Sequence, residues 1–362
     1  MRVAVLGAAG TIAPAIVRDL AESEEVSSIL LLDLEPDRAA EVADEQGGGK
    51  AEARAADARS GLAAELERVD VLLNSASYRI NLDAMRACLE AGCNYLDLGG
   101  LYHMTSRQLQ LSDEFRRREK LAILGIGSSP GKTNLMAARL AGELGKLDVC
   151  HVSAAGRDLD PPQGFSIPYA LPTLIDELTL APVVLRDGAP VELEPLAPGG
   201  KVDFGEPIGT AATIHTLHSE LLTFGESFGC SDASFRLSLA DDLLERLREL
   251  AGATEQAKEA AGRDAGRPSP QTVSVHLVEA RRGAGEARMR AVTRPHEEWG
   301  IGGGIVSTAA PAAAAVRLLA RGAIRAHGAL PPEACIEPEP MFAELEARGC
   351  EFEIEVSQEA AA

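Results

Sequence analysis

Short apolar runs alternate with helical patterns along the first third of the chain. The apolar runs occupy residues 2–6, 28–32, 51–55, 70–73, 94–98 and 121–124. Helical patterns lie between them, up to residue 21, at 36–44, 81–91 and 106–119, and from about 133. This alternation needs a parallel sheet with helices on both faces. We therefore expect an α/β fold with a Rossmann-type doubly wound parallel sheet, which binds ligands at the carboxyl ends of its strands.

The pattern changes after about residue 146, where strand-like runs dominate. They lie at residues 148–154, 183–185, 211–217, 235–239, 272–280 and 287–293. These runs predict an inserted α+β domain with a mostly antiparallel sheet. We expect a Rossmann domain at 1–133, the inserted substrate and dimerisation domain at 134–302, a helix returning to the first domain at 303–330, and a C-terminal segment with an acidic tail at 331–362.

A glycine-containing turn follows the first predicted strand. Its sequence has the form G-x-x-G-x-x-A, a variant of the dinucleotide-binding pattern. Glycines permit the tight turn from strand to helix and let backbone N–H groups approach a pyrophosphate. The candidate cofactor-binding residues of the turn are Gly7, Ala9, Gly10, Thr11 and Ile12.

The ends of the next strands supply further candidate cofactor contacts. Asp33 ends the second predicted strand, where a carboxylate accepts hydrogen bonds from an adenine ribose and repels a 2′-phosphate. The expected cofactor is therefore NAD, with NADP kept open because Arg38 lies nearby. Asp57 follows the third strand and is a candidate adenine contact or a loop carboxylate. After the fourth strand, the candidates are Asn74, Ser75 and Ala76.

Composition limits the classes of partner. The formal net charge of −20 repels phosphate backbones and anionic lipid, so we expect neither nucleic acid nor a membrane as partner. The six cysteines form no CxxC pair or zinc-like cluster, which predicts reduced thiols in a cytoplasmic protein and no metal site. The uncharged stretches 3–17 and 299–316 are interrupted by glycine and proline, so we interpret both as parts of a soluble fold.

Residues 127–133, with the sequence GSSPGKT, resemble the P-loop that binds nucleoside triphosphates. The spacing is wrong, because Gly127 stands one residue too close to Gly131 and Gly125 one too far. Pro130 also removes one backbone donor. We expect this loop to orient cofactor or substrate through a helix N-terminus rather than to bind ATP.

Three passages, at residues 91–105, 125–134 and 331–338, together with the N-terminal turn, resemble the saccharopine dehydrogenase superfamily. The sequence DLGGLYHMT within the first passage is most similar to bacterial L-lysine 6-dehydrogenases. The resemblance covers nearly the whole chain, including residues 217–220 and 302–315. The chain departs from the family pattern at Ala9, at Ile12 and at Lys132, where relatives commonly carry an apolar or small residue.

The resemblance implies a Rossmann domain interrupted by an α+β domain, a homodimer, and hydride transfer between NAD(P) and the carbon of an amino-acid C–N bond. For the lysine subgroup, the ε-carbon of L-lysine would be oxidised and ammonia released. Two alternatives stay open. One is a saccharopine- or carboxynorspermidine-type reductase that condenses an aldehyde with an amine, and the other is a nucleotide-binding regulator without catalysis.

Amine oxidation needs a base close to the reacting nitrogen. Asp97 ends the fifth predicted strand and either serves as base or amine ligand, or caps the Gly99–Gly100 turn. His103 is the titratable candidate with a pKa near the working pH, and Tyr102 is a candidate proton relay. Because these two residues are neighbours in a predicted loop, we expect only one to face the site.

Five residues are candidates for substrate binding. His218 stands beside Glu220 as a candidate substrate contact, and Arg236 could clamp a substrate carboxylate. Lys132 would place a cation near the site and favour a carboxylate-rich substrate over a cationic lysine side chain. The whole set is Lys132, Asn134, His218, Glu220 and Arg236.

Overall fold

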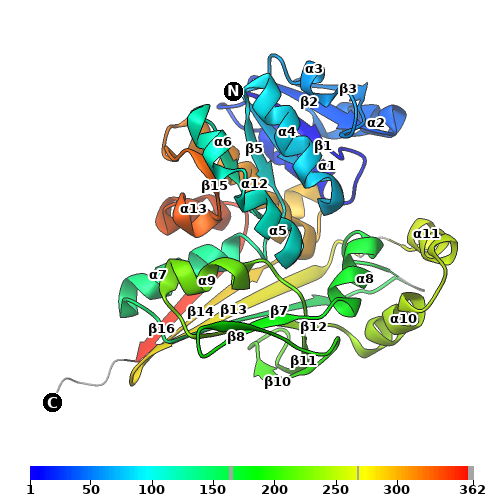
Figure 1. Cartoon of the computed structure of the whole chain (residues 1–362). Coiled ribbons are helices and arrows are strands. Elements are labelled where there is room, and N and C mark those ends of the chain that lie inside the picture. Colours follow the sequence, from blue (N-terminus) through cyan, green and yellow to red (C-terminus); the bar gives the residue numbers. More distant parts are fainter. Residues whose placement is uncertain (163–165, 267–268, 358–362) are drawn as a thin grey trace. The chain divides into compact units, whose positions relative to one another are not determined.

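The computed structural model describes residues 1–162, 166–266 and 269–357, which form two compact units (Figure 1). The first unit comprises Met1–Lys132 and Thr308–Leu345, and the second comprises Thr133–Ser307 and the segment from Glu346 onward. The chain therefore leaves the first unit and later returns to it. The predicted C-terminal segment, residues 331–362, is divided between the two units.

The first unit is built on a seven-stranded parallel sheet in the order β15-β6-β5-β4-β1-β2-β3. Strand order reverses beside β1, since β2 lies on one side of it and β4 on the other. This switch point is where ligands bind in doubly wound sheets, and the Rossmann prediction is confirmed. The strands are β1 (Arg2–Leu6), β2 (Ser28–Asp33), β3 (Ala51–Ala55), β4 (Val71–Asn74), β5 (Asn94–Asp97), β6 (Leu121–Ile123) and β15 (Gly328–Leu330).

Helices of the first unit bury their apolar faces on this sheet, in a core that includes Leu6, Leu72, Tyr95 and Phe115. The helices are α1 (Ala13–Ala21), α2 (Pro36–Gln46), α3 (Leu62–Glu65), α4 (Asn81–Ala91), α5 (Leu101–Leu109), α6 (Ser112–Arg117) and α13 (Pro338–Glu346), and α12 (Gly303–Ala320) belongs to this unit from Thr308 on. The single helix predicted at 106–119 is wrong: two helices occupy this region, and the first begins at Leu101.

Helix α12 is the one described helix that is long and apolar enough to cross a membrane by length and composition. Of its apolar window, 72% is buried inside the structure. That burial is the pattern of a core helix, and it agrees with the interpretation of residues 299–316 as part of a globular fold.

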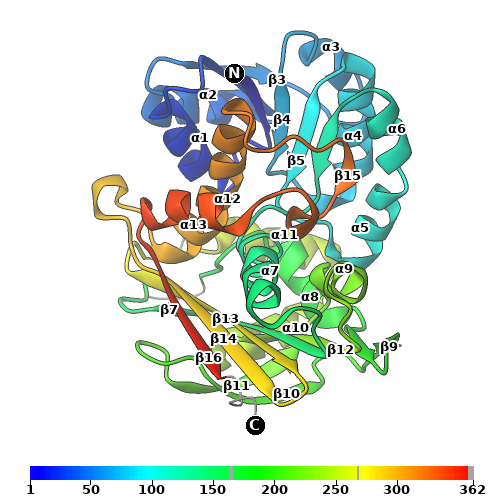
Figure 2. The same cartoon turned by 90° about the vertical axis from the view of Figure 1, so that its left-hand side faces the viewer.

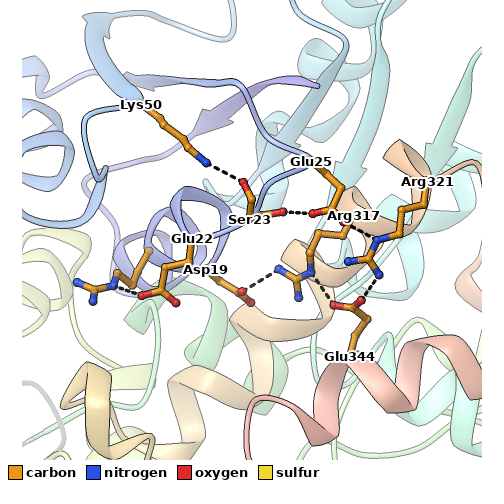
Figure 3. A network of polar contacts seen from close by, with 9 residues as sticks. Asp19, Glu22, Ser23, Glu25, Lys50, Arg317, Arg321 and Glu344 are labelled. Carbon is orange, nitrogen blue, oxygen red and sulfur yellow. Dashed lines mark hydrogen bonds and ion pairs between the residues drawn. The ribbon is translucent and has the colours of Figure 1, made fainter.

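A network of ion pairs ties the returning helices to α1 (Figure 3). The Arg317 Nη1 lies 2.7 Å from the Asp19 Oδ1, and its Nε lies 2.6 Å from the Glu344 Oε2. The Arg321 guanidinium bridges Glu344 and Glu25. The side chains of Asp19 and Arg317 are almost fully buried. These contacts join distant segments of the sequence, since Asp19 and Arg317 are 298 residues apart.

Acid is expected to weaken the first unit through this network. The Ser23 hydroxyl, with help from Arg321, lowers the pKa of Glu25 from 4.5 to about 2, and Arg317 and Arg321 outweigh burial to lower the pKa of Glu344. A carboxyl group with a lowered folded pKa stabilises the fold above its unfolded value of 4.5 and loses that contribution as pH falls toward about 2. The free energy of unfolding of the wild type, measured with urea, should therefore be lower at about pH 3 than at about pH 6.

The variant Glu25→Gln provides the control for this pH dependence. It should lose less unfolding free energy between the two pH values than the wild type, because one of the two shifted carboxyl groups is absent. An identical loss in both proteins would show that Glu25 does not contribute to acid sensitivity.

The second unit contains a nine-stranded, mostly antiparallel sheet in the order β10-β11-β12-β7-β13-β14-β16, with β8 paired to β12 and β9 paired to β8 (Figure 2). The α+β prediction is confirmed, and the β12–β7 pair is parallel. The strands are β7 (Val149–Asp158), β8 (Val183–Arg186), β9 (Ala189–Glu192), β10 (Pro198–Asp203), β11 (Thr210–His215), β12 (Asp232–Ser238), β13 (Thr272–Arg282), β14 (Gly285–Thr293) and β16 (Cys350–Ser357).

The described helices of this unit, besides the start of α12, are α7 (Lys132–Leu144), α8 (Leu171–Thr179), α9 (Glu220–Phe228), α10 (Asp241–Ala251) and α11 (Glu255–Asp264). Helices α8 and α10 share an apolar cluster in which Leu171, Leu174 and Leu247 are buried. Helix α11 ends before residues 267 and 268, which lie outside the described residues.

Candidate functional site

The turn after β1 is pressed against the loop after β4. Gly7 has a φ of +79°, and a Cβ built there would lie 2.6 Å from the Cα and N of Ala76. Its amide donates to the Leu32 carbonyl at 2.8 Å, and the Gly10 amide closes the turn onto the Gly7 carbonyl at 3.0 Å. Position 7 thus requires glycine on both conformational and steric grounds.

Asp33 lies at the carboxyl end of β2 and holds this turn. Its Oδ2 accepts a hydrogen bond from the Ala9 amide at 2.9 Å, and its Oδ1 accepts one from the Glu35 amide at 3.0 Å. The Arg38 guanidinium donates to the Ala9 carbonyl at 3.2 Å and pairs with Glu35. The guanidinium that could bind a 2′-phosphate is therefore already engaged, and the carboxylate predicted to bind a ribose lies at the turn.

The residues around the turn fit a dinucleotide. The Ser75 Oγ, directly after β4, is buried and has no hydrogen-bond partner among the described residues. Within the same described part of the chain, the amides of Thr11 and Ile12 donate to no backbone carbonyl. Buried polar groups are normally paired, so unpaired donors at a Rossmann turn match a pyrophosphate or ribose acceptor. These groups, with Asp33, would hold NAD(P).

Asn74 and Asp57 support loops at this edge of the sheet. Buried Asn74 donates to Asn81 and to the Tyr95 hydroxyl, and its Oδ1 accepts the Ala76 amide at 3.0 Å. Asp57 is exposed, and its Oδ1 accepts the Arg59 amide at 2.9 Å. Their direct contact with a cofactor stays a prediction, while the structure shows a loop-holding role for both.

Asp97 is buried at the end of β5 and is surrounded by donors. The amides of Gly99 and Gly125 donate to its Oδ1 at 3.0 and 2.7 Å, and Gln108 and Asn81 donate to its Oδ2 at 2.6 and 3.1 Å. Burial raises the pKa of Asp97 in spite of these bonds. In the structure Asp97 therefore caps the Gly99–Gly100 turn, which is one of the two roles considered for it.

Tyr102 and His103 lie in the first turn of α5 and not in a loop, which corrects the sequence-based expectation. Their rings meet edge to face with centroids 5.5 Å apart. His103 is exposed, whereas Tyr102 is half-buried, and burial raises its pKa. The helix begins early because Gln108, in its last turn, donates to Asp97 and thereby fixes the helix on the Gly99–Gly100 turn.

Lys132 and Asn134 are buried at the start of α7. The loop before them folds on itself, since the Gly127 amide donates to the Pro130 carbonyl and the Lys132 amide donates to the Gly127 carbonyl, both at 2.9 Å. A Cβ at Gly131 would lie 2.3 Å from the Gly127 oxygen. The amides of Gly127 and Lys132 are thus used within the loop, in agreement with the rejection of a P-loop.

The second unit places His218 and Glu220 together in a buried polar cluster. The His218 Nδ1 lies 3.4 Å from the Glu220 Oε2, and Glu220 accepts a hydrogen bond from the Thr133 hydroxyl at 3.1 Å. The imidazole stacks on Phe235 of β12, with ring centroids 3.4 Å apart and planes 19° apart. Burial disfavours the imidazolium, but the carboxylates of Glu220 and Glu177 prevail and raise the pKa of His218.

Sequence reasoning missed two members of this cluster, Glu177 and Tyr169. The Tyr169 hydroxyl, in the loop before α8, donates to the Glu177 Oε2 at 2.5 Å, and Glu177 of α8 interacts electrostatically with His218. Burial raises the pKa of Glu177, while His218 lowers it. The sequence feature that could have indicated Glu177 is the helical spacing of apolar residues in α8, because it places Glu177 next to the helix face that is buried.

Arg236 is separated from this cluster. Phe235 and Arg236 are neighbours in β12, so their side chains point to opposite faces of the sheet. Phe235 carries His218, whereas Arg236 donates to the Glu279 Oε2 at 2.8 Å on the other face. The predicted substrate-binding set is therefore split, and Arg236 cannot clamp a carboxylate held at His218.

Comparisons with known proteins agree with this geometry. Residues 3–123 match the family described as the saccharopine dehydrogenase NADP binding domain. The carboxyaminopropylagmatine dehydrogenase of Synechocystis sp. is 26% identical over 192 residues, which are 50% of this chain and 47% of that relative. The match thus spans about half the length of the relative.

The apo L-Glu-forming saccharopine dehydrogenase of Saccharomyces cerevisiae has a similar fold, with a TM-score of 0.68 at 14% identity over 99% of this chain and 100% of that chain. The match of residues 3–123 lies on the unit that carries the Gly7 turn and Asp33. Residues 3–123 thus match the saccharopine dehydrogenase NADP binding domain, and the chain as a whole shares the fold of the yeast saccharopine dehydrogenase.

Proposed function

We propose that the protein is an NAD(P)-dependent dehydrogenase of the saccharopine dehydrogenase superfamily that acts on CH–NH groups. In this proposal its substrate carries a cationic amine, and its reductive direction condenses an aldehyde with that amine. The observation that carries the proposal is the pair of buried carboxyl groups, Glu177 and Glu220, around His218 in the second unit. A buried charge needs an opposite charge to be stable. A protonated His218 balances one carboxylate, and a substrate ammonium or guanidinium would balance the second.

The curated relative supports the condensing direction, because its name describes an agmatine that carries a carboxyaminopropyl group. A second candidate is the oxidative deamination of L-lysine at its ε-carbon, which the DLGGLYHMT resemblance at residues 97–105 supports. Both substrates present a cation to the cluster. They differ in the reaction, since lysine deamination releases ammonia and the condensing enzyme joins two organic partners.

The nicotinamide, when bound, accepts or donates a hydride at the carbon of the C–N bond. In this proposal Thr11, Ile12 and Ser75 bind the dinucleotide, and Asp33 selects its ribose. The buried carboxyl groups of Glu177 and Glu220 would bind the cationic part of the substrate.

Steady-state assays at the absorbance of reduced nicotinamide test the proposal. Agmatine or putrescine with L-aspartate semialdehyde and NADH should give oxidation of NADH that depends on both organic partners. L-lysine with NAD should give slower reduction of NAD or none. Faster turnover of lysine would favour the second candidate, and NADH binding without turnover of any pair would favour the non-catalytic regulator.

Asp33→Arg is expected to shift the cofactor preference from NAD toward NADP. Loss of a charge-assisted hydrogen bond to the ribose costs about 1.5–3 kcal/mol, so the affinity for NAD should fall about tenfold or more. Titration of each variant with NADH and NADPH measures the ratio. Asp37→Arg makes the same charge change on the exposed first turn of α2 and should leave the ratio unchanged. Equal behaviour of the two variants would show that Asp33 does not contact the ribose.

A further inference from the structure

Asn81 is a buried amide that contacts several segments of the first unit. It is the first residue of α4 and is 1% exposed. Its Oδ1 accepts a hydrogen bond from the Asn74 Nδ2 at 2.9 Å. Its Nδ2 donates to the Asp97 Oδ2 at 3.1 Å, and lies 3.3 Å from both the Gly99 carbonyl and the Gln108 Oε1. One side chain therefore joins the end of β4, the end of β5 and helix α5.

The partners of this amide fix its orientation. If its oxygen and nitrogen exchanged places, two NH₂ groups would meet at Asn74 and two oxygens would meet at Asp97, and both contacts repel. A chain of donors results: the Ala76 amide donates to the Asn74 Oδ1 at 3.0 Å, Asn74 donates to Asn81, and Asn81 donates to Asp97. All three hydrogen bonds point toward the buried carboxylate, and bonds in such a chain strengthen one another.

This chain starts at the loop that packs against the Gly7 turn. A Cβ built on Gly7 would lie 2.6 Å from the Cα of Ala76, so the two segments are in close contact. The preceding residue, Ser75, carries the buried hydroxyl that has no hydrogen-bond partner among the described residues. At its other end the chain reaches Asp97, which accepts the Gly99 amide at 3.0 Å. The loop after β4 and the turn after β5 are thus held by the same side chain.

We propose that Asn81 is a positioning residue for the cofactor, because it ties Asn74 to the Asp97 carboxylate and thereby holds the loop at residues 75 and 76 against the Gly7 turn. This inference rests on the dinucleotide site of the proposed function. Asn81 acts through Asn74, and every contact in the chain lies within the first unit. The position requires a short side chain that accepts a hydrogen bond at one end and donates one at the other, which is what a carboxamide provides.

Two single substitutions should break the chain at the same point. Asn81→Asp places a second carboxylate where the amide now donates to Asp97 at 3.1 Å, and Asp97→Asn places an NH₂ group against that of Asn81. Each should weaken NADH binding by the full-length protein about tenfold or more, because a hydrogen bond to a charged group is lost and Asn74 is no longer held. Fluorescence titration measures the affinity, and circular dichroism measures folding.

The double variant Asn81→Asp, Asp97→Asn supplies a readout that a merely structural role would not move. It exchanges donor and acceptor, so the new carboxylate can accept from Asn74 and from the new amide. The Gln108 carboxamide can turn over to match them. The double variant should therefore recover most of the NADH affinity that each single variant loses, and this non-additivity is the mark of a direct interaction.

Tyr95→Phe is the control variant for loosening of the core. The Tyr95 hydroxyl is the other acceptor of the Asn74 Nδ2, at 3.2 Å, and its loss leaves the bonds from Ala76 to Asn74 and from Asn74 to Asn81 in place. This variant should be less stable than the wild type, but its affinity for NADH should stay within about threefold.

The outcomes separate the role of Asn81 from the cofactor site itself. Wild-type NADH affinity in Asn81→Asp, no recovery in the double variant, or an equal loss in Tyr95→Phe would overturn the role of Asn81. If Asn81→Asp does not fold, the double variant decides, since it should fold and bind NADH, and failure in either respect counts against the proposal. A folded wild type that binds no NADH would instead overturn the dinucleotide site.

Discussion

Replacing Arg317 by alanine is expected to destabilise the first unit by about 3–5 kcal/mol, the cost of breaking one side of a buried ion pair. The Arg317 side chain is 3% exposed and lies between Asp19 and Glu344, at 2.7 and 2.6 Å. Its removal takes the guanidinium away from a carboxylate that has no exposure to water. Urea unfolding monitored by circular dichroism measures the change.

Arg321→Ala is the matched control, since Arg321 lies four residues after Arg317, directly after the end of α12, and also pairs with Glu344. Its side chain is 45% exposed, so water replaces much of the lost interaction, and the expected cost is about 0–1 kcal/mol. Equal losses in the two variants would mean that burial does not set the strength of this network, and that α12 is held to the sheet mainly by its apolar face.

Gly7→Ala is expected to reduce both stability and cofactor affinity. The new methyl group would lie 2.6 Å from the backbone of Ala76, and alanine is strained at a φ of +79°. Overpacking of this kind costs about 1–3 kcal/mol and the strained backbone about 1 kcal/mol more. Because the turn and the Ser75–Ala76 loop must move apart, the amides of the turn also leave the positions suited to a pyrophosphate.

Gly49→Ala separates strain from steric conflict. Gly49 has a φ of +77°, but a Cβ there would meet no atom within 4 Å. This variant should lose only the stability that backbone strain costs, without the cost of overpacking. It should bind NADH as the wild type does. Thermal unfolding and NADH titration of both variants distinguish the two effects, and normal NADH binding by Gly7→Ala would contradict the placement of the cofactor at this turn.

Local sequence signals predicted those parts of the fold in which pattern and packing agree. The bounds of β1, β3 and α4 coincide with the predicted ones, because each is a well-delimited run between turn residues. The start of α5 could not be predicted in this way. Its N-cap is Gly100 with no side-chain cap, and what fixes the helix is a tertiary bond from Gln108 to Asp97.

The candidate site shows the same division. The turn and Asp33 are local features, and sequence spacing located them, whereas Glu177 joins His218 only through the packing of α8. That Phe235 and Arg236 face opposite sides of the sheet was predictable, since side chains alternate along a strand. What could not be read was that His218 would stack on Phe235, because the loop after β11 carries no periodicity.

Titration of the wild-type protein with NADH, followed by nicotinamide fluorescence, tests most directly whether the Gly7 turn holds a dinucleotide. We predict saturable binding at one site per chain, stronger for NADH than for NADPH, because the Asp33 carboxylate lies at the turn, where it would face an adenine ribose, and Arg38 is engaged with Glu35 and Ala9. A chain that is folded by circular dichroism and yet shows no saturable response to either nucleotide would contradict it.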